Sequence, residues 1–213
     1  MSTYDLEKPL TKTSLKASVM AVCKNDSMLQ ALLDQYGQPP MWERTQSFET
    51  LVHIVLEQKV SLASAQAVMK RVQALCPAMA PAHFLQVSEK ALRDAGISAR
   101  KVSYCYSMAQ ALTSGELSLA GLRRCDDEVV VQRLCAIRGI GPWTAGVYLL
   151  MAMRRPDAWA SGDRALVVSF AESTALNIIP GYRELDDHAA RWQPHRAAAA
   201  RLLWHAYLSR RGR

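Results

Sequence analysis

The chain has 213 residues, half of them hydrophobic, and a formal net charge of +7 at pH 7. This length and composition indicate a folded globule with a substantial core rather than a disordered chain. The positive charge suits a polyanionic partner, although charge alone indicates only non-specific attraction. No apolar run approaches the roughly 18 residues of a membrane-spanning helix, and the polar start MSTYDLEKPLTKTS is unlike a signal peptide. We therefore expect no membrane partner and a cytoplasmic location.

Helical periodicity runs along almost the whole chain. The predicted helices span residues 14–23, 27–36, 61–75, 88–94, 98–113, 126–137, 142–153, 163–173 and 194–209, with a further apolar stripe at helical spacing from Phe48 to Val55. Glycine or proline follows several of these segments, as it does at helix ends. The sequence shows no long alternating strand pattern, internal repeat or low-complexity tract, and it therefore predicts an all-α fold.

The cysteines and histidines give no sign of a metal site. The five cysteines, Cys23, Cys76, Cys105, Cys125 and Cys135, are scattered, odd in number and without a Cys-x-x-Cys pair. This usage predicts neither a disulfide framework nor a zinc site, and buried hydrophobic thiols are the simplest interpretation. The five histidines lack the spacing with acids or thiols that divalent metal sites use.

The most informative stretch covers residues 134–166, LCAIRGIGPWTAGVYLLMAMRRPDAWASGDRAL. One predicted helix ends in Gly139-Ile140-Gly141, and Pro142 suits the first position of the next helix because its φ is preset and it lacks an N–H. The first amides of that helix have no intrahelical partner and lie at the positive end of its dipole, where phosphate binds. Such a turn can hold a nucleic-acid backbone without reading sequence. An ordinary αα-hairpin has the same turn, so GIGP alone leaves both interpretations open.

This segment resembles the helix-hairpin-helix DNA glycosylases of the HhH-GPD superfamily, in particular the 3-methyladenine DNA glycosylase II (AlkA-type) branch. The resemblance runs from roughly Phe48 to Leu208 and rests on four pieces in the family's order: FETLVHIVLEQKVSLASA, LRDAGISARKVSY, the hairpin with Asp163, and WQPHRAAAARLLW. It implies a single domain with a two-lobed helical core, an active-site cleft between the lobes and no N-terminal β-domain. One lobe would hold residues of about 1–40 and 155–213, and the central lobe those of about 45–154.

Asp163 follows Trp143 by twenty residues and stands after Gly162 at the start of a predicted helix. A lone Asp in this place is most often an N-cap. The resemblance implies instead that Asp163 is the catalytic aspartate of the family. An N-glycosidic bond is hydrolysed through an oxocarbenium-like sugar, and a buried carboxylate stabilises that cation and orients or deprotonates water.

Trp143 bears on the class of reaction. Family members that also cut the DNA strand have a Lys two residues after the second hairpin glycine, and its amine attacks the sugar. A Trp cannot form the Schiff base that this reaction needs, and no Lys follows Lys101 in the chain. The resemblance therefore implies a monofunctional glycosylase that leaves an abasic site.

Trp143 and Trp204 stand at positions that line the base pocket in the family. A flipped base stacks on such side chains, and an indole favours a cationic, methylated purine by cation–π attraction, about 0.5–2 kcal/mol. Core packing is the alternative role for each of them, and Trp159 and Trp192 are expected to be structural. Val147 stands where the family usually has an aromatic residue, which favours a more open pocket.

The family's intercalating side chain comes from the loop after the first core helix, here Glu57-Gln58-Lys59-Val60-Ser61. Lys59 occupies the wedge slot, Gln58 is the alternative plug for the gap that a flipped base leaves, and a solvated helix end is the structural alternative. Phosphate contacts are expected mainly from the amides of the hairpin, including that of Trp143. The predicted DNA-binding residues are Gln58, Lys59, Ser61, Lys101, Arg138, Gly139, Ile140 and Gly141.

The resemblance also bears on cofactors. In related hairpins, main-chain carbonyls coordinate a monovalent cation that bridges to DNA phosphate, and the matching carbonyls for a Na⁺ or K⁺ ion are those of Cys135, Ile137 and Ile140. Some relatives carry a four-cysteine iron–sulfur loop after the aspartate helix. No cysteine follows Cys135 here, so we expect no iron–sulfur cluster and no other cofactor.

The predicted partner is double-stranded DNA with alkylated bases of the 3-methyladenine or 7-methylguanine type, bound by a monomer in a nucleoid-associated location. Two alternatives remain open: a helix-hairpin-helix glycosylase for an oxidised or deaminated base, and a non-catalytic DNA-binding module. The module would have no need of Asp163 or of an aromatic pocket. A preference for an abasic-site mimic over intact DNA distinguishes a glycosylase from such a module.

Overall fold

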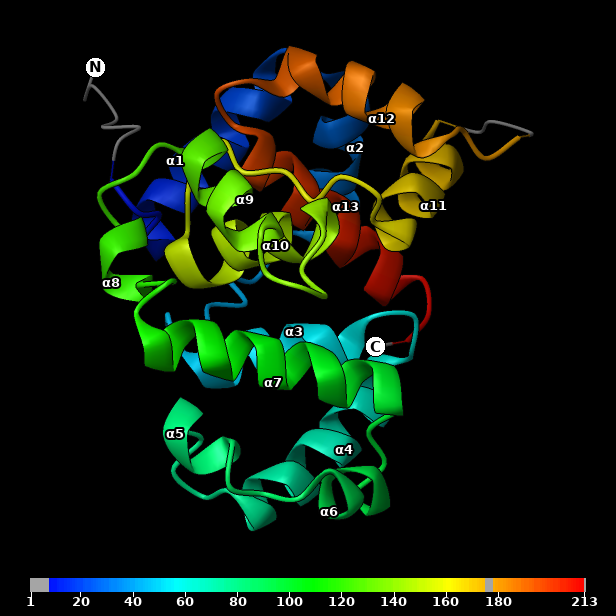
Figure 1. Cartoon of the computed structure of the whole chain (residues 1–213). Helices are drawn as coiled ribbons and strands as arrows, with labels where there is room; N and C mark the ends of the chain where they lie inside the picture. The colour runs from blue at the N-terminus through cyan, green and yellow to red at the C-terminus, as the bar shows by residue number, and fades with distance from the viewer. Residues whose placement is uncertain (1–7, 175–177, 213) are drawn as a thin grey trace. The chain divides into compact units, whose positions relative to one another are not determined.

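The computed structural model describes residues 8–174 and 178–212. This part of the chain consists of helices joined by loops, without a strand (Figure 1). The chain divides into two compact units, which are Met1–Glu43 with Leu149–Arg213 (unit 1) and Arg44–Tyr148 (unit 2). Unit 1 is thus built from both ends of the chain, and unit 2 from one continuous stretch. None of the helices described here is long and apolar enough to cross a membrane.

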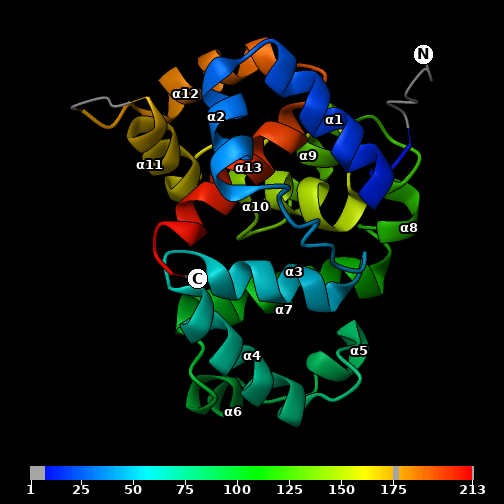
Figure 2. The ribbon, with the colours of Figure 1, turned by 180° about the vertical axis from the view of Figure 1, so that it is seen from behind.

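Unit 1 is arranged around its last helix. Its elements are α1 (Lys12–Lys24), α2 (Ser27–Tyr36), a π-helix (Leu149–Met153), α11 (Arg164–Ser173), α12 (Tyr182–Ala189), a 3-10 turn (Ala190–Trp192) and α13 (Arg196–Ser209). Helix α13 packs against α1, α2 and α11 (Figure 2). Its four consecutive alanines, Ala197 to Ala200, are fully buried. An alanine helix is thin and apolar all round, so its neighbours can approach it from several sides.

Arg201 follows these alanines and is itself fully buried. Its guanidinium donates hydrogen bonds to the carbonyl oxygens of Met41 at 3.2 Å, Leu150 at 2.6 Å and Ala197 at 3.0 Å. Burial lowers the pKa of Arg201 to about 10, which is still far above neutral, so the side chain stays a cation. A buried cation is costly unless hydrogen bonds satisfy it, and these three bonds tie separate stretches of unit 1 together.

Unit 2 is arranged around its first helix. Its helices are α3 (Phe48–Glu57), α4 (Leu62–Leu75), α5 (Pro81–Phe84), α6 (Glu89–Asp94), α7 (Ala99–Ser114), α8 (Leu119–Leu122), α9 (Asp127–Cys135) and α10 (Pro142–Tyr148). Helix α3 contacts α4, α7 and α10, and seven of its ten residues are buried, as expected for a helix that is apolar on almost every face. Serine side chains cap five of these helices, at Ser47, Ser61, Ser88, Ser98 and Ser118.

The all-α prediction is confirmed for the described residues, and the predicted helices begin and end within two residues of the observed ones. One differs in kind: the helix predicted over 142–153 is α-helical only to Tyr148 and continues as the π-helix. The sequence analysis missed α5, α8 and α12. The first two have four residues each, too few to show a period, and α12 buries only Leu185 and Ala189.

Candidate functional site

The glycine hairpin of unit 2 lies between α9 and α10. Gly139 has a φ of +93°, in the left-handed region, and a Cβ there would lie 2.1 Å from Cγ of Tyr104. Both the backbone and the neighbouring ring therefore require glycine at this position. A Cβ at Gly141 would meet no atom within 4 Å. The second glycine thus borders open space beside the start of α10.

Two isoleucines anchor this hairpin. Ile137 and Ile140 are buried, and the Ile140 N–H donates to the Ile137 carbonyl at 3.1 Å. The Ile140 amide is therefore used inside the turn, and the predicted phosphate contacts concern the amides of the two glycines and Trp143. Arg138 lies in the same turn with an exposed side chain.

Gln58 is the C-cap of α3 and connects the predicted wedge loop to the hairpin. Its Nε2 donates to the Gly139 carbonyl and to Thr144 Oγ1, each at 3.0 Å, so its side chain points into unit 2. Lys101 Nζ donates to the carbonyls of Leu56 and Gln58, each at 2.8 Å. It thereby satisfies carbonyls that the end of α3 leaves without partners, and burial lowers its pKa. The DNA contacts predicted for Gln58 and Lys101 stay predictions.

The rest of the wedge loop is exposed. Lys59 has a φ of +58° and an exposed side chain, and Val60 next to it is 47% exposed. Ser61 Oγ accepts the N–H of Ser64 at 3.2 Å as the N-cap of α4. The loop therefore presents Lys59 and Val60 outward, whereas the hydroxyl of Ser61 is used to begin a helix.

Asp163 is the N-cap of α11 in unit 1. Its Oδ1 accepts the N–H of Leu166 at 2.9 Å and the indole N–H of Trp204 at 3.2 Å. Asp163 and Trp204 are each only 8% exposed, although an aspartate is rarely buried so far. The cap and the predicted catalytic group are thus the same carboxylate, and a second, buried donor on α13 holds it.

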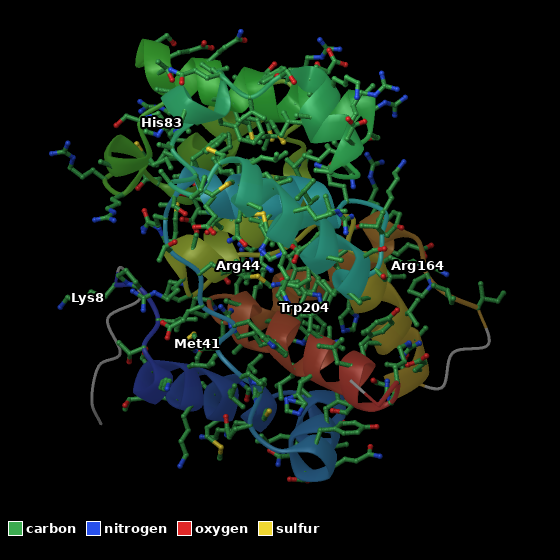
Figure 3. All side chains as sticks on the ribbon, turned by 90° about the horizontal axis from the view of Figure 1, so that it is seen from below. Lys8, Met41, Arg44, His83, Arg164 and Trp204 are labelled. Carbon is green, nitrogen blue, oxygen red and sulfur yellow. The ribbon has the colours of Figure 1, made fainter. Side chains whose placement is uncertain are left out.

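Trp42 is an aromatic neighbour of Trp204 that the sequence analysis missed. Its ring meets that of Trp204 edge-on, with centroids 6.3 Å apart, and lies 6.3 Å from the ring of His205. It has a φ of +46° in a non-helical segment after α2, so no periodic pattern marks it. Arg201 holds the carbonyl of the preceding Met41, which Figure 3 labels together with Trp204. Spacing in the sequence could not have revealed this contact.

Trp143 is the second residue of α10 and is partly exposed. It belongs to unit 2, whereas Asp163 and Trp204 belong to unit 1. The structure therefore brings Asp163 and Trp204 together, and the pocket role of Trp143 stays a prediction. Val147, which replaces an aromatic residue of the family, is buried in unit 2.

The thiols do not resemble reactive groups. Cys23, Cys76 and Cys105 are buried, while Cys125 and Cys135 are partly exposed. Burial raises the pKa of Cys105 to about 12 and that of Cys23 to about 11, and such thiols are poor nucleophiles at neutral pH. In residues 8–174 and 178–212, no group of three or more His, Cys, Asp or Glu side chains is placed to hold a metal ion.

A helical core with a glycine hairpin and a buried carboxylate at the start of a helix defines a protein of the helix-hairpin-helix class. The chain belongs to the HhH-GPD superfamily of base excision DNA repair proteins, whose family model matches residues 52–194. The superfamily expected from the sequence is thereby confirmed.

Individual relatives resemble most of the chain. DNA-3-methyladenine glycosylase 1 of Schizosaccharomyces pombe is 27% identical over 199 residues, which are 92% of this chain and 86% of that protein. The solved structure of a DNA-3-methyladenine glycosidase from Bacillus halodurans has a TM-score of 0.75 and 29% identity, over 92% of this chain and 91% of that one. A solved S. pombe 3-methyladenine DNA glycosylase in complex with abasic DNA has a TM-score of 0.84 over 92% and 97%. At 23% identity, this last likeness shows the fold alone.

Proposed function

We propose that this protein is a DNA glycosylase that excises alkylated purines, of the 3-methyladenine and 7-methylguanine type, from double-stranded DNA. The observation that carries the proposal is the buried Asp163 carboxylate, which the Leu166 amide and the Trp204 indole hold in place. The relatives from S. pombe and B. halodurans that are similar over nearly the whole chain support the class of substrate.

Asp163 acts on the sugar rather than on the base. As the N-glycosidic bond breaks, its electron pair leaves with the purine, and positive charge develops on the sugar as an oxocarbenium ion. The carboxylate stabilises this cation and orients or deprotonates the water that adds to the sugar carbon. The products are the free base and an abasic sugar. A purine that is already cationic through methylation leaves as a neutral base, so the site needs no general acid for it.

The aromatic residues select the base. Trp204, which donates to Asp163, forms an edge-on pair with Trp42, and an indole attracts a cationic purine more than a neutral one, by about 0.5–2 kcal/mol. A role of Trp143 in stacking on the base is part of this proposal and rests on the family resemblance alone. Because Trp143 stands where bifunctional relatives have the attacking Lys, the protein releases the base without cutting the strand.

DNA is held through the hairpin. The amides of Gly139, Gly141 and Trp143 bind phosphate, and Arg138 adds an exposed positive charge. Lys59 and Val60, the exposed residues of the wedge loop, fill the gap that the flipped base leaves. Extrusion of one base needs one active site, so we propose a monomer that works next to the nucleoid in the cytoplasm.

A Na⁺ or K⁺ ion at the hairpin is part of this proposal. The Ile137 carbonyl accepts the Ile140 amide. Among the described residues, no backbone N–H of a turn, loop or cap donates to the carbonyls of Cys135 and Ile140. These oxygens keep lone pairs for an ion, and carbonyl oxygens are ligands that hard cations take. A bound ion would add positive charge next to a DNA phosphate. We propose no other cofactor and no iron–sulfur cluster.

The test is base release from duplex DNA treated with a methylating agent. We expect the wild type to release 3-methyladenine or 7-methylguanine and to leave abasic sites without nicks before alkali. Asp163→Asn is expected to lower the single-turnover rate by about 10²- to 10⁴-fold, with little change in stability because Asn is also a good N-cap.

Unit 1 contains a matched control for this substitution. Asp26 caps α2 through the N–H of Leu29 at 3.1 Å and accepts the indole N–H of Trp192 at 2.8 Å. Asp26→Asn therefore changes the same kind of cap and the same kind of indole contact, and we expect it to leave the rate within about twofold. Base release that survives Asp163→Asn would move catalysis away from Asp163.

The two alternatives are outcomes of the same assay. No release of methylated purines, with binding to an abasic-site mimic intact, would indicate a glycosylase for another base, to be found with oxidised and deaminated substrates. No release and no preference for the mimic would indicate a DNA-binding module.

A further inference from the structure

A second carboxylate of unit 1 holds the turn that ends at Asp163. The indole N–H of Trp159 donates to Asp186 Oδ1 at 2.7 Å, and the hydroxyl of Ser161 donates to Asp186 Oδ2. The Asp163 amide donates to the Ala160 carbonyl at 3.2 Å, so the two anchored residues flank the residue whose carbonyl closes the turn. Asp186 thus uses both carboxylate oxygens on one short stretch of chain.

The turn needs such an anchor because Gly162 joins Ser161 to Asp163. Gly162 has a φ of +82° and would meet no atom within 4 Å if it carried a Cβ, so neighbouring side chains do not restrict it. Hydrogen bonds to a carboxylate are roughly twice as strong as bonds between neutral groups. The two bonds to Asp186 therefore restrict the backbone just before the glycine.

Asp186 itself stands on a packed support. Its helix α12 contacts α11, and the ring of His188 on α12 lies 4.6 Å from that of Phe170 on α11. The ring of Trp192 lies 5.1 Å from that of His188 and 5.7 Å from that of Trp159. One aromatic cluster therefore joins α12, α11 and the anchored turn, and it fixes Asp186 with respect to the helix that Asp163 begins.

We propose that Asp186 is a positioning residue for the Asp163 carboxylate. It fixes the turn over residues 159–163, so that Asp163 Oδ1 meets both the Leu166 amide and the Trp204 indole. This inference rests on the proposed catalytic function of Asp163 and adds the device that sets its place. Asp186 needs no contact with DNA or base for this role.

The kinetic test removes the acceptor, Asp186, and one of its two donors, Trp159, in separate variants. Asp186→Ala removes both bonds, and Trp159→Phe removes one donor while it keeps a ring beside Trp192. We expect Asp186→Ala to lower the single-turnover rate of 7-methylguanine release by about 10- to 100-fold, with the KM from separate steady-state measurements changed less than about twofold. Trp159→Phe is expected to lower this rate less than Asp186→Ala does. Its effect on the rate should nearly vanish in the Asp186→Ala background, because the two residues form one contact.

Asp26→Ala is the control for general loss of stability, because it deletes a carboxylate that accepts the indole N–H of Trp192 in the same aromatic cluster. We expect it to lower Tm about as much as Asp186→Ala and to leave the rate within about twofold. Equal rate losses in the two variants, or an unchanged rate in Asp186→Ala, would overturn the positioning role.

A second readout does not depend on activity. The Trp204 indole N–H donates to Asp163, so its resonance in ¹⁵N-labelled protein reports where the Asp163 carboxylate lies. Asp186→Ala is expected to shift the Trp204 signal as well as that of Trp159, whereas Asp26→Ala shifts only that of Trp192. An unmoved Trp204 signal in Asp186→Ala contradicts the positioning role. If wild-type protein releases no base but the Trp204 signal moves, the proposed function fails and the positioning role stands.

Discussion

Each unit contains a glycine turn that leads into a helix, and the two turns differ in the residue before the helix. In unit 1, Gly162 is followed by Asp163, whose carboxylate accepts the Leu166 amide at the start of α11. In unit 2, the left-handed Gly139 leads to Gly141, which has no side chain that could cap α10. A helix that carries its own anion at its N-terminus has that anion fixed for chemistry, whereas an uncapped start leaves amides for an external anion.

The two turns therefore present different parts of the chain, side chains in unit 1 and main-chain groups in unit 2. The Asp163 turn presents a side-chain carboxylate that the Trp204 indole holds, and in the proposed function these side chains discriminate one base from another. The hairpin offers mainly main-chain groups, which every nucleotide backbone can meet equally well. This division suits the proposed function, in which the protein binds DNA of any sequence and reacts with few bases.

The largest effect on stability is expected at the hairpin glycine. Gly139→Ala forces a Cβ into the ring of Tyr104 and a left-handed φ onto alanine, so we expect a loss of about 3 kcal/mol in the free energy of unfolding, measured with urea. The Cβ of Gly162→Ala meets no atom within 4 Å, so this variant should lose only about 1 kcal/mol in the free energy of unfolding. Equal losses of stability in the two variants would mean that the clash with the Tyr104 ring adds nothing to the cost of the substitution at Gly139.

An intermediate effect, on rate rather than on stability, is expected at the carboxylate. Trp204→Phe removes the indole donor of Asp163 but keeps a ring beside Trp42, and we expect base release to slow about 10-fold. Trp192→Phe removes the equivalent donor of Asp26 but keeps a ring in the aromatic cluster that supports Asp186, so it is the matched control and should leave the rate nearly unchanged. A slow Trp192→Phe variant would show that any indole–carboxylate bond of unit 1 matters equally.

The smallest effect is expected at the end of α3. Lys101→Met leaves the carbonyls of Leu56 and Gln58 without their donor, and we expect a loss of about 1 kcal/mol in the free energy of unfolding. Lys90→Met, which removes an exposed ion pair with Asp94, is the control and should change the free energy of unfolding by less than about 0.5 kcal/mol. A Lys101→Met variant with wild-type stability but weaker DNA binding would assign Lys101 to phosphate rather than to α3.

Local signals in the sequence predicted most of the helix starts. Ser61, Ser88, Ser98 and Asp163 each act as a cap whose partner lies three residues along the chain, so a short window contains all the necessary information. The change from α-helix to π-helix after Tyr148 was not predicted, because the residue pattern of an apolar run does not specify which backbone carbonyl each amide meets.

The candidate site was predictable only in part, because its contacts join residues that lie far apart in the sequence. Asp163 and Trp204 were named from the family pattern, but their hydrogen bond spans 41 residues. Trp42 comes from a segment without periodicity, and nothing in the local sequence around Arg201, which binds the carbonyl next to Trp42, marks it as buried. Asp186 stands in a helix that the sequence analysis missed. Long-range contacts of non-periodic residues have no counterpart in a local pattern.

The fully buried alanines of α13 limit how this protein can be re-engineered. Any larger side chain at Ala197 to Ala200 would overpack a helix that contacts three others, so libraries aimed at new lesion specificity would lose most variants there to misfolding. Trp42 is the better target, since it touches Trp204 from a partly exposed, non-helical segment. Laboratory evolution of the proposed pocket should therefore vary the non-helical segment around Trp42 and leave the alanine core of α13 unchanged.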